Sequence, residues 1–272
     1  MPTKSFKYAP IAFRTGCCMD YGKILLTGGS GALGRHITGS GRFKNLPSPS
    51  HDEMDITDTD SIGKFFNTHA FDAIIHCAAM ARVGECEKSP NKALATNTIG
   101  TANLVMAAMK KEEQLQKSIR FIHISTDGVY QSTEGNYSED DATIPYNVYG
   151  WTKLGAESAV NLLRNFCIIR TRFFNPEKIK YDKYATDSYT SMIPVGELAQ
   201  AIAIALESSF AGTINIGGER KSDYDMLRKY KPTIKPCKFD DIQSKTPFRL
   251  SKDASMNISL WKKLKGKEEI KA

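Results

Sequence analysis

The chain lacks the features that define membrane, secreted and repetitive proteins. No run of about 18 apolar residues occurs in its 272 residues, so no membrane-spanning helix is expected. The first 21 residues contain Lys4, Lys7 and Arg14 without a continuous apolar core, unlike a secretory leader. No internal repeat and no low-complexity tract is present. These absences leave an ordinary globular protein.

Cysteine is sparse and shows no pattern. The six cysteines lie at positions 17, 18, 77, 86, 167 and 237, and none has the spacing of metal ligands. Cys77 and Cys167 fall in apolar runs, where buried free thiols are common. We therefore expect no metal site and a reducing, cytoplasmic location.

Positive charge is in excess but is not concentrated. The net charge is +7, yet Lys and Arg are spread along the chain and are not interleaved with aromatic residues, so nucleic acid is not an expected partner. A basic surface suits solubility and would also attract an anionic ligand such as a nucleotide diphosphate.

Short apolar runs alternate with helical patterns over the first two thirds of the chain. The runs are residues 23–27, 71–77, 119–125 and 166–171. This alternation predicts an α/β fold with a Rossmann-type, doubly wound parallel sheet. Further elements are less regular: a strand near 44–48, weakened by Pro47, helices near 86–111, 195–206 and 256–264, and a strand near 213–216.

The same pattern suggests how the chain divides. We expect residues 1–22 to be an N-terminal extension, disordered in solution. Residues 23–171 would form the dinucleotide-binding Rossmann domain, to which residues 187–217 return. Residues 172–186 and 218–272 would form a small C-terminal substrate-binding portion.

Three glycines separate the first strand from the first helix. Gly28, Gly31 and Gly34 follow the pattern G-x-x-G-x-x-G, and a helix is expected from Ala32 to Thr38. Glycine permits a tight turn and close approach of the backbone to a pyrophosphate, which the free N–H groups of the helix start would bind. A plain glycine-rich turn is the alternative, but the strand before and the helix after favour a dinucleotide site.

The region that would contact the cofactor ribose does not decide between NAD and NADP. Acidic residues occur at Asp55 and Asp58, as expected for a 2′-hydroxyl contact. His51, Arg42 and Lys44 stand near them and would suit a phosphate. Asp58 or Thr57 is also expected to cap the next helix.

A tyrosine and a lysine stand four residues apart at the start of a helical pattern. Tyr149 and Lys153 would therefore share one helix face. A lysine charge near a phenol favours the phenolate and lowers its pKa, and such a tyrosine can exchange a proton with a carbinol oxygen. A core tyrosine beside a solvated lysine is the alternative.

Two strand ends carry residues suited to a ligand. Small Ala78 and Ala79 follow the run 71–77 and leave room for a cofactor at the carboxyl edge of the sheet. Ser125, Thr126 and Asp127 follow the run 119–125. Their hydroxyls could bond a substrate carbonyl, although a Ser-Thr pair is also common in turns.

Four motifs follow one another along the chain: the 28/31/34 glycines, Cys77-Ala-Ala79, Ser125-Thr-Asp127 and Tyr149-x-x-x-Lys153. With these motifs in this order, the chain resembles the extended short-chain dehydrogenase/reductase superfamily, and most closely its dTDP-4-dehydrorhamnose reductase branch. The resemblance covers residues 23–175 well and continues loosely to Gly218.

The resemblance implies a role for each matched residue. Tyr149 would protonate the sugar ketone, Lys153 would lower the tyrosine pKa and hold the nicotinamide ribose, and Thr126 would bond the carbonyl oxygen. The expected cofactor contacts are Gly28, Gly31, Ala32, Leu33, Gly34, Asp55, Ile56, Cys77, Ala78, Ala79, Asn97 and Lys153. The expected substrate contacts are Asp127, Arg172 and Arg249. The cofactor would be NADP(H) or NAD(H), with NADP(H) slightly favoured.

The resemblance therefore predicts an NAD(P)H-dependent reductase of a nucleotide-linked 4-keto-6-deoxy sugar, serving polysaccharide synthesis and expected to form a homodimer.

The sequence departs from the family pattern at two places. Gly128 stands where related epimerases carry a cysteine, and the segment from Arg172 to Thr186 is shorter than the family's sugar-enclosing segment. One alternative is a cofactor-binding regulatory subunit that resembles the regulatory subunit of methionine adenosyltransferase. The other is a nucleotide-sugar epimerase or dehydratase.

Overall fold

Five parallel strands form the central sheet of the computed structural model, which describes residues 23–41, 43 and 46–269. Their spatial order is β1-β2-β3-β4-β9. The strands are β1 (Ile24–Thr27), β2 (Ala73–His76), β3 (Arg120–Ile124), β4 (Phe166–Arg170) and β9 (Gly212–Asn215). The predicted parallel, doubly wound sheet is confirmed. The predicted extension 1–22 lies outside the described residues.

The strands read as unbroken apolar runs because both faces of the sheet are covered. Successive side chains alternate between the faces. Leu25 and Ile74 belong to one core cluster, whereas their neighbours Leu26 and Ile75 belong to the other. Burying each such side chain contributes roughly 1.5–3 kcal/mol, so the two clusters fix the register of the strands.

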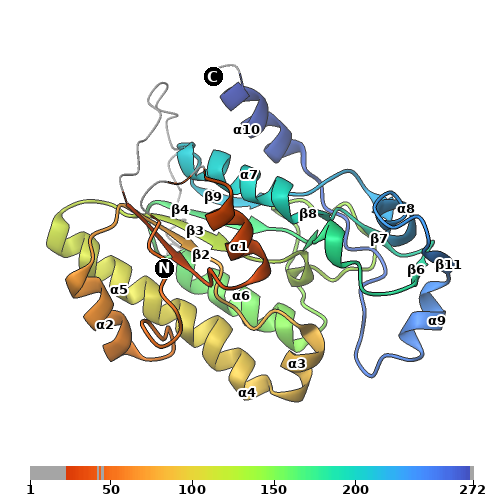
Figure 1. Cartoon of the computed structure of the whole chain (residues 1–272), viewed down its shortest axis with the longest axis horizontal. Coiled ribbons are helices and arrows are strands. Elements are labelled where there is room, and N and C mark those ends of the chain that lie inside the picture. The colour runs from red at the N-terminus through yellow and green to blue at the C-terminus, as the bar shows by residue number, and fades with distance from the viewer. Residues whose placement is uncertain (1–22, 42, 44–45, 270–272) are drawn as a thin grey trace, which may run out of the picture.

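Helices form a layer on each face of the sheet (Figure 1). One layer contains α1 (Ala32–Gly39), α7 (Val195–Glu207) and α10 (Ser259–Glu269), whose apolar residues join the cluster of Leu26 and Ile75. The opposite layer contains α2 (Thr59–Thr68), α5 (Gly100–Leu115) and α6 (Val148–Val160). Of the two predicted caps, Asp58 is the one that caps α2, since its side chain accepts a hydrogen bond from the Asp60 N–H.

A smaller region of short elements lies beyond the carboxyl edge of the sheet, at the right of Figure 1. It contains three two-stranded pairings and two short helices. These are β5 (Phe173–Phe174) with β8 (Ile193–Pro194), β6 (Lys183–Ala185) with β11 (Lys235–Cys237), β7 (Tyr189–Thr190) with β10 (Lys221–Ser222), α8 (Asp223–Leu227) and α9 (Phe239–Gln243).

Three predicted elements differ from the structure. The strand expected near 44–48 is wrong for its described residues, which form no strand. The Leu26 N–H donates to Pro47 O at 2.9 Å, but Pro47 has no N–H group with which to continue a strand pairing. The helix expected over 86–111 is divided into α3 (Val83–Lys88), α4 (Pro90–Ala93), the π-helix η1 (Leu94–Ile99) and α5. The closing helix begins at Ser259, not at Met256, which forms a β-bridge with Tyr137.

Within the described ranges, no helix combines the length and apolar character that crossing a membrane requires.

Candidate active site

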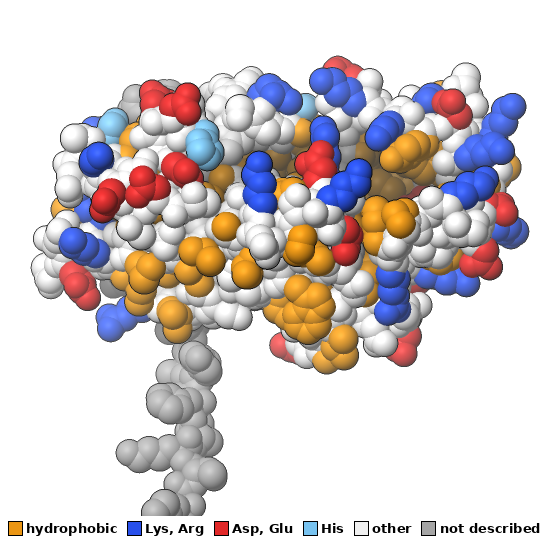
Figure 2. Space-filling view, turned by 90° about the horizontal axis from the view of Figure 1, so that it is seen from below, with side chains coloured by type: hydrophobic (Ala, Val, Ile, Leu, Met, Phe, Trp, Pro, Cys, Tyr) orange, Lys and Arg blue, Asp and Glu red, His pale blue; other side chains and the backbone are white. Residues whose placement is uncertain are grey.

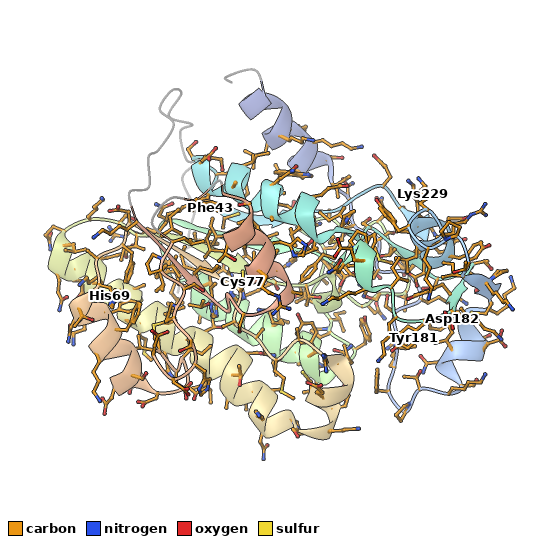
Figure 3. The ribbon with its side chains drawn as sticks, viewed as in Figure 1. Phe43, His69, Cys77, Tyr181, Asp182 and Lys229 are labelled. Carbon is orange, nitrogen blue, oxygen red and sulfur yellow. The ribbon has the colours of Figure 1, made fainter. Side chains whose placement is uncertain are left out.

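A cavity of about 1280 Å³ runs from the carboxyl edge of the sheet to the small region beyond it. Of the residues that line it, Figure 3 labels Cys77 near the centre of the molecule and Tyr181 and Asp182 at the right. Seen from below, the molecule is hollowed on this side, with hydrophobic walls and Lys and Arg side chains near the rim (Figure 2). The cavity therefore connects the predicted cofactor turn with the predicted substrate region.

The glycine turn forms one end of this cavity. Gly28 has φ +73°, and a Cβ there would lie 2.6 Å from the Ala78 backbone nitrogen. A Cβ on Gly34 would collide with the carbonyl oxygen of Gly28. The Gly31 N–H closes the turn onto Gly28 O at 3.0 Å. Backbone groups and the start of α1 thus line the cavity, an arrangement that fits a pyrophosphate.

A directed chain of hydrogen bonds supports this turn from below. Thr101 Oγ1 donates to Asn97 O (2.6 Å), so it accepts from His76 Nε2 (2.9 Å). His76 Nδ1 must then accept from Thr27 Oγ1 (2.6 Å), which accepts from the Ala78 N–H (3.3 Å). Burial lowers the pKa of His76 to about 3, with the Lys153 charge adding to the effect, so the ring is neutral. The chain links the end of β1 to the turn after β2 and to η1.

Thr126 and Asp127 lie where β3 ends. The Thr126 hydroxyl accepts a hydrogen bond from the Gly128 N–H and donates to Asp127 Oδ1, both at 3.1 Å. Asp127 Oδ2 pairs with Arg172 Nε at 2.7 Å. Burial raises the pKa of Asp127, whereas Arg172 acts in the opposite direction. All three residues line the cavity.

Tyr149 enters the cavity from the first turn of α6. Asn147 caps this helix by accepting from the Gly150 N–H at 2.8 Å, and Gly150 has no room for a Cβ against Gly128 O. The expectation that Lys153 lowers the tyrosine pKa is not met. Burial raises the pKa of Tyr149 above its usual value, the Asp127 charge adds to the rise, and Thr126 and Arg172 only reduce it. The phenol is therefore protonated at neutral pH.

Lys153 is buried below the cavity, with 2% of its surface exposed. Its Nζ lies 3.1 Å from His123 Nε2 on β3. Burial lowers the pKa of Lys153 to about 8, and the nearby Glu157 and Cys77 oppose this shift. The lysine is thus on the same helix as Tyr149, as predicted, but its hydrogen bond goes to a residue that the sequence did not indicate.

Four other predicted cofactor contacts do not line the cavity. Ile56 is buried in the core, and Asp55 bonds Thr57 through its carboxylate at 2.8 Å. Ala78 packs beneath the glycine turn. Asn97 holds both the N–H (2.7 Å) and the carbonyl (3.1 Å) of Met80 and donates to Thr152 at 2.9 Å, so it steadies the cavity wall from behind.

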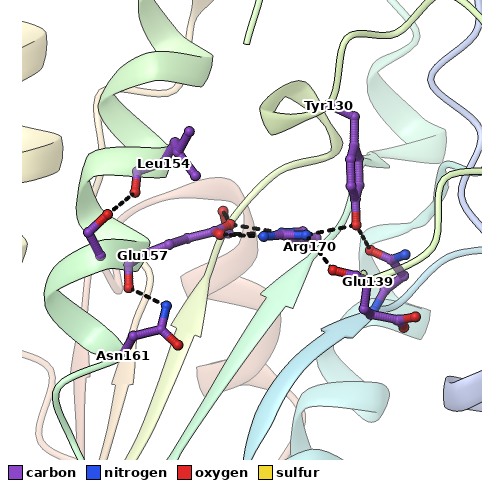
Figure 4. A network of polar contacts seen from close by, with 9 residues as sticks. Tyr130, Glu139, Leu154, Glu157, Asn161 and Arg170 are labelled. Carbon is purple, nitrogen blue, oxygen red and sulfur yellow. Dashed lines mark hydrogen bonds and ion pairs between the residues drawn. The ribbon is translucent and has the colours of Figure 1, made fainter. Parts of the chain in front are cut away.

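A buried network connects the cavity to the core. Ser125 Oγ donates to Glu157 Oε1 at 2.5 Å, and Glu157 pairs with Arg170 at 2.8 Å. Arg170 also donates to Tyr130 Oη at 2.9 Å (Figure 4). The network ties β3, α6 and β4 together next to Lys153, and the sequence patterns did not indicate it.

The comparison with protein families decides the family. The model of the RmlD substrate binding domain matches residues 22–193, which contain the glycine turn, the strand-end Thr126 and the Tyr149 helix.

The chain belongs to the RmlD substrate-binding-domain family.

Curated relatives of this RmlD-family chain carry different names. It is 35% identical over 142 residues to a dTDP-4-dehydrorhamnose reductase of Mycolicibacterium smegmatis, covering 51% of this chain and 41% of that protein. It is 30% identical over 173 residues to methionine adenosyltransferase 2 subunit beta of Rattus norvegicus, covering 57% of this chain and 49% of that protein. The match thus spans about half the length of these curated relatives.

A solved structure matches over nearly the whole chain. The structure of a hypothetical dTDP-4-dehydrorhamnose reductase from Sulfolobus tokodaii is 27% identical, with a TM-score of 0.77, and the match covers 89% of this chain and 94% of that one. The resemblance proposed from the motifs is therefore confirmed at the level of family and fold.

The far end of the cavity in this RmlD-family chain contains residues that the sequence did not indicate. Arg249 lines this cavity, with its guanidinium 5.7 Å from the centre of the Tyr146 ring, and its contact with substrate stays a prediction. Aromatic and basic side chains of the small region also line the cavity: Tyr181, Lys183, Tyr184, Phe239, Lys245 and Phe248. No periodic pattern marks these residues, because they come from loops and elements of a few residues.

Proposed function

We propose that this chain is an NAD(P)H-dependent reductase of a nucleotide-linked 4-keto-6-deoxy sugar. The observation that carries the proposal is a single cavity bounded by the glycine turn, by Thr126 and Tyr149, and by the basic and aromatic far end. We infer that a dinucleotide and a sugar nucleotide would share this cavity. The dTDP-4-dehydrorhamnose reductase name of one curated relative supports the same substrate class.

In this proposal the glycine turn would hold the pyrophosphate of a reduced nicotinamide dinucleotide, which would supply the hydride. The Thr126 hydroxyl, which donates to Asp127 Oδ1 in this structure, would turn to donate to the ketone oxygen. Tyr149 would donate its phenolic proton to that oxygen, since its raised pKa keeps it protonated. The product is the corresponding alcohol, and the phenolate is then reprotonated from solvent. Because Arg172 is already paired with Asp127, Arg249 is the better candidate for a substrate phosphate.

The cofactor contacts are testable by binding alone. We expect wild-type protein to bind NADPH, and NADH slightly less well, in calorimetry. Gly31→Glu should weaken binding at least about 100-fold, because a carboxylate beside the turn repels the pyrophosphate at close range. Gly39→Glu, at the other end of α1 with no atom within 4 Å of its Cβ position, is the matched control and should bind like wild type.

Turnover separates reduction from mere binding. NADPH consumption with dTDP-4-dehydrorhamnose, or with another dTDP-linked 4-keto-6-deoxy sugar, is the expected result. Cofactor binding without turnover across such substrates would contradict the reductase.

A second candidate is a cofactor-binding regulatory subunit. The relative named methionine adenosyltransferase 2 subunit beta favours it, as does the short segment between β4 and β7. Cofactor binding with no turnover, together with stable association with a methionine adenosyltransferase catalytic subunit, would establish this alternative. The retained Thr126 and Tyr149 in one cavity favour the reductase.

We further propose the domain division given by the sequence, with residues 23–171 and 187–217 holding the cofactor. A homodimer and a cytoplasmic location stay predictions. The dimer has a candidate surface in the neighbouring η1, α5 and α6, where Ile99, Met106 and Trp151 are each about half exposed.

A further inference from the structure

Two histidines face each other in the middle of the sheet, directly below the cavity. His76 of β2 and His123 of β3 are register partners, and their ring centres are 5.3 Å apart. Both are completely buried. A buried imidazole loses its hydration, so its nitrogens need partners. His76 has two, as described above, and therefore serves the glycine turn.

His123 has a different environment. Its Nε2 is 3.1 Å from Lys153 Nζ, and its Nδ1 has no hydrogen-bond partner among the described residues. An unpartnered buried nitrogen destabilises a fold, and an apolar residue at this position would avoid that loss. The benefit of a histidine here therefore lies at Nε2, in its contact with the lysine.

The chemistry of the pair fixes the direction of the hydrogen bond. An ammonium group has three N–H donors and no acceptor. Burial and the positive charge of Lys153 hold the pKa of His123 well below its usual range, so the ring is neutral. Lys153 therefore donates to Nε2, and the ring proton of His123 resides on Nδ1.

We propose that His123 is a positioning residue for Lys153, whose ammonium it holds at the carboxyl edge of the sheet through Nε2. One N–H group of Nζ is bound to His123, which restricts the directions of the other two. These are the donors that would reach a cofactor ribose. The expected effects on cofactor binding and turnover rest on the proposed function. The hydrogen bond between His123 and Lys153 does not depend on that function.

Solution NMR tests the hydrogen bond without cofactor or substrate. In protein with ¹⁵N-labelled histidine side chains, we expect His123 as the Nδ1–H tautomer with Nε2 accepting. In Lys153→Met, the Nε2 resonance should shift because its donor is gone. Nε2 found protonated at neutral pH, or unaffected by Lys153→Met, would overturn the proposal.

NADPH calorimetry then tests the positioning role. His123→Leu should weaken binding about tenfold, the loss typical of one hydrogen bond to a charged group. His123→Gln, whose amide oxygen can accept from Nζ, should stay within about threefold of wild type. His69→Leu is the matched control, because His69 is exposed at the end of α2, far from Cys77 (Figure 3).

A double-mutant cycle separates positioning from general structure. If His123 acts through Lys153, His123→Leu has no further effect on NADPH binding in the Lys153→Met background. An equal loss in both backgrounds would mean that His123 only supports the fold, and the proposal would fail.

The pH profile of turnover gives a further readout in the reductase. The groups facing Lys153 are Glu157 on its own helix, Cys77 after β2, and the two histidines. In His123→Leu the Lys153 ammonium loses its hydrogen-bond acceptor, which disfavours the charged form and lowers the pKa of the lysine. If loss of this charge ends turnover at alkaline pH, the alkaline limb of the profile should move to lower pH in His123→Leu. An unchanged limb would contradict the proposal. If the protein turned over no keto sugar, the proposed function would fail, while the NMR result would still decide the hydrogen bond.

Discussion

Tyr149 suits proton donation because of where its hydroxyl lies. It reaches the cavity beside Thr126, and burial together with the Asp127 carboxylate raises its pKa. A phenol with a raised pKa holds its proton until negative charge develops on a nearby oxygen. Burial and the Asp127 charge set the direction of the shift, which differs from the expectation that the Lys153 charge would lower the pKa.

Replacing Tyr149 by Phe should therefore remove turnover while leaving the cofactor site intact. We expect kcat with a dTDP-linked 4-keto-6-deoxy sugar to fall at least about 100-fold, with NADPH affinity within about threefold of wild type. Tyr230→Phe, on an exposed ring stacked edge-on against Phe174, is the matched control and should retain kcat. A Tyr149→Phe variant with normal kcat would remove the tyrosine from the mechanism.

At this scale the sequence identified the cavity-lining residues of the glycine turn and of the strand end and helix that carry Thr126 and Tyr149. It identified neither the aromatic and basic residues of the small region nor the partners that support the site. Tyr149, Thr126 and the glycines have spacings that chemistry restricts, so a motif marks them. His123 and Glu157 stand in a strand and a helix where any residue of suitable size would preserve the pattern. Their roles follow from contacts between residues far apart in the sequence, His123 with Lys153 across 30 residues and Glu157 with Ser125 across 32 residues. No local sequence pattern indicates such contacts.

Helix α1 is placed by its contact with the turn before it. Gly34 lies in its first turn, where a Cβ would collide with the Gly28 carbonyl and lie 2.5 Å from Gly29 Cα. Both are backbone atoms, which cannot move aside as a side chain can. The glycine turn and α1 therefore form one packed unit at the carboxyl end of β1.

This contact predicts opposite effects for two substitutions in one helix. Gly34→Ala should lower the free energy of unfolding by about 1–3 kcal/mol through overpacking and weaken NADPH binding. The alanine side chain in Gly39→Ala meets no atom within 4 Å. This variant should raise the free energy of unfolding by about 0.5 kcal/mol, because alanine has a higher helix propensity than glycine. Urea unfolding of both variants measures the difference. Equal effects would mean that the close approach at Gly34 relaxes without cost.

Strands and long helices were predictable because burial on two faces imposes a period on the sequence. The strand expected near 44–48 failed where prolines remove the donors of a ladder, although the segment still touches β1 through Pro47. The division of the helix after Cys86 was only suggested by Pro90. Its π-helical turn has no sequence marker, yet it contains Asn97, whose amide holds the Met80 loop.

Across the whole molecule, polar groups are buried along the axis of the sheet. His76, His123, Lys153, Glu157 and Arg170 are all at least nine-tenths buried. The composition shows none of this, since the charged fraction of 25% is ordinary. Placing these groups requires knowledge of which strands are neighbours, and that is set by the complete topology.

These buried groups make stability depend on pH. The pKa of His76 is about 3 in the folded protein, against about 6.5 in an unfolded chain. Between these values the unfolded state binds more protons, so the free energy of unfolding rises with pH in this window. The full difference corresponds to about 5 kcal/mol as an upper limit. Asp127 and Asp223, whose pKa values are raised by burial, oppose part of this rise.

A difference measurement isolates the histidine. In His76→Gln the amide can still accept from Thr27 and donate to Thr101 but cannot titrate. Urea unfolding between pH 4 and 7.5 should show a rise in stability that is smaller in His76→Gln than in wild type by roughly 2 kcal/mol or more, with exposed His69→Gln as the matched control. Parallel curves for wild type and His76→Gln would mean that His76 has the same pKa in the folded and unfolded states. The folded ring would then take up a proton below about pH 6.5, where the hydrogen-bond chain from Ala78 to Asn97 could not run in the direction that its donors and acceptors require.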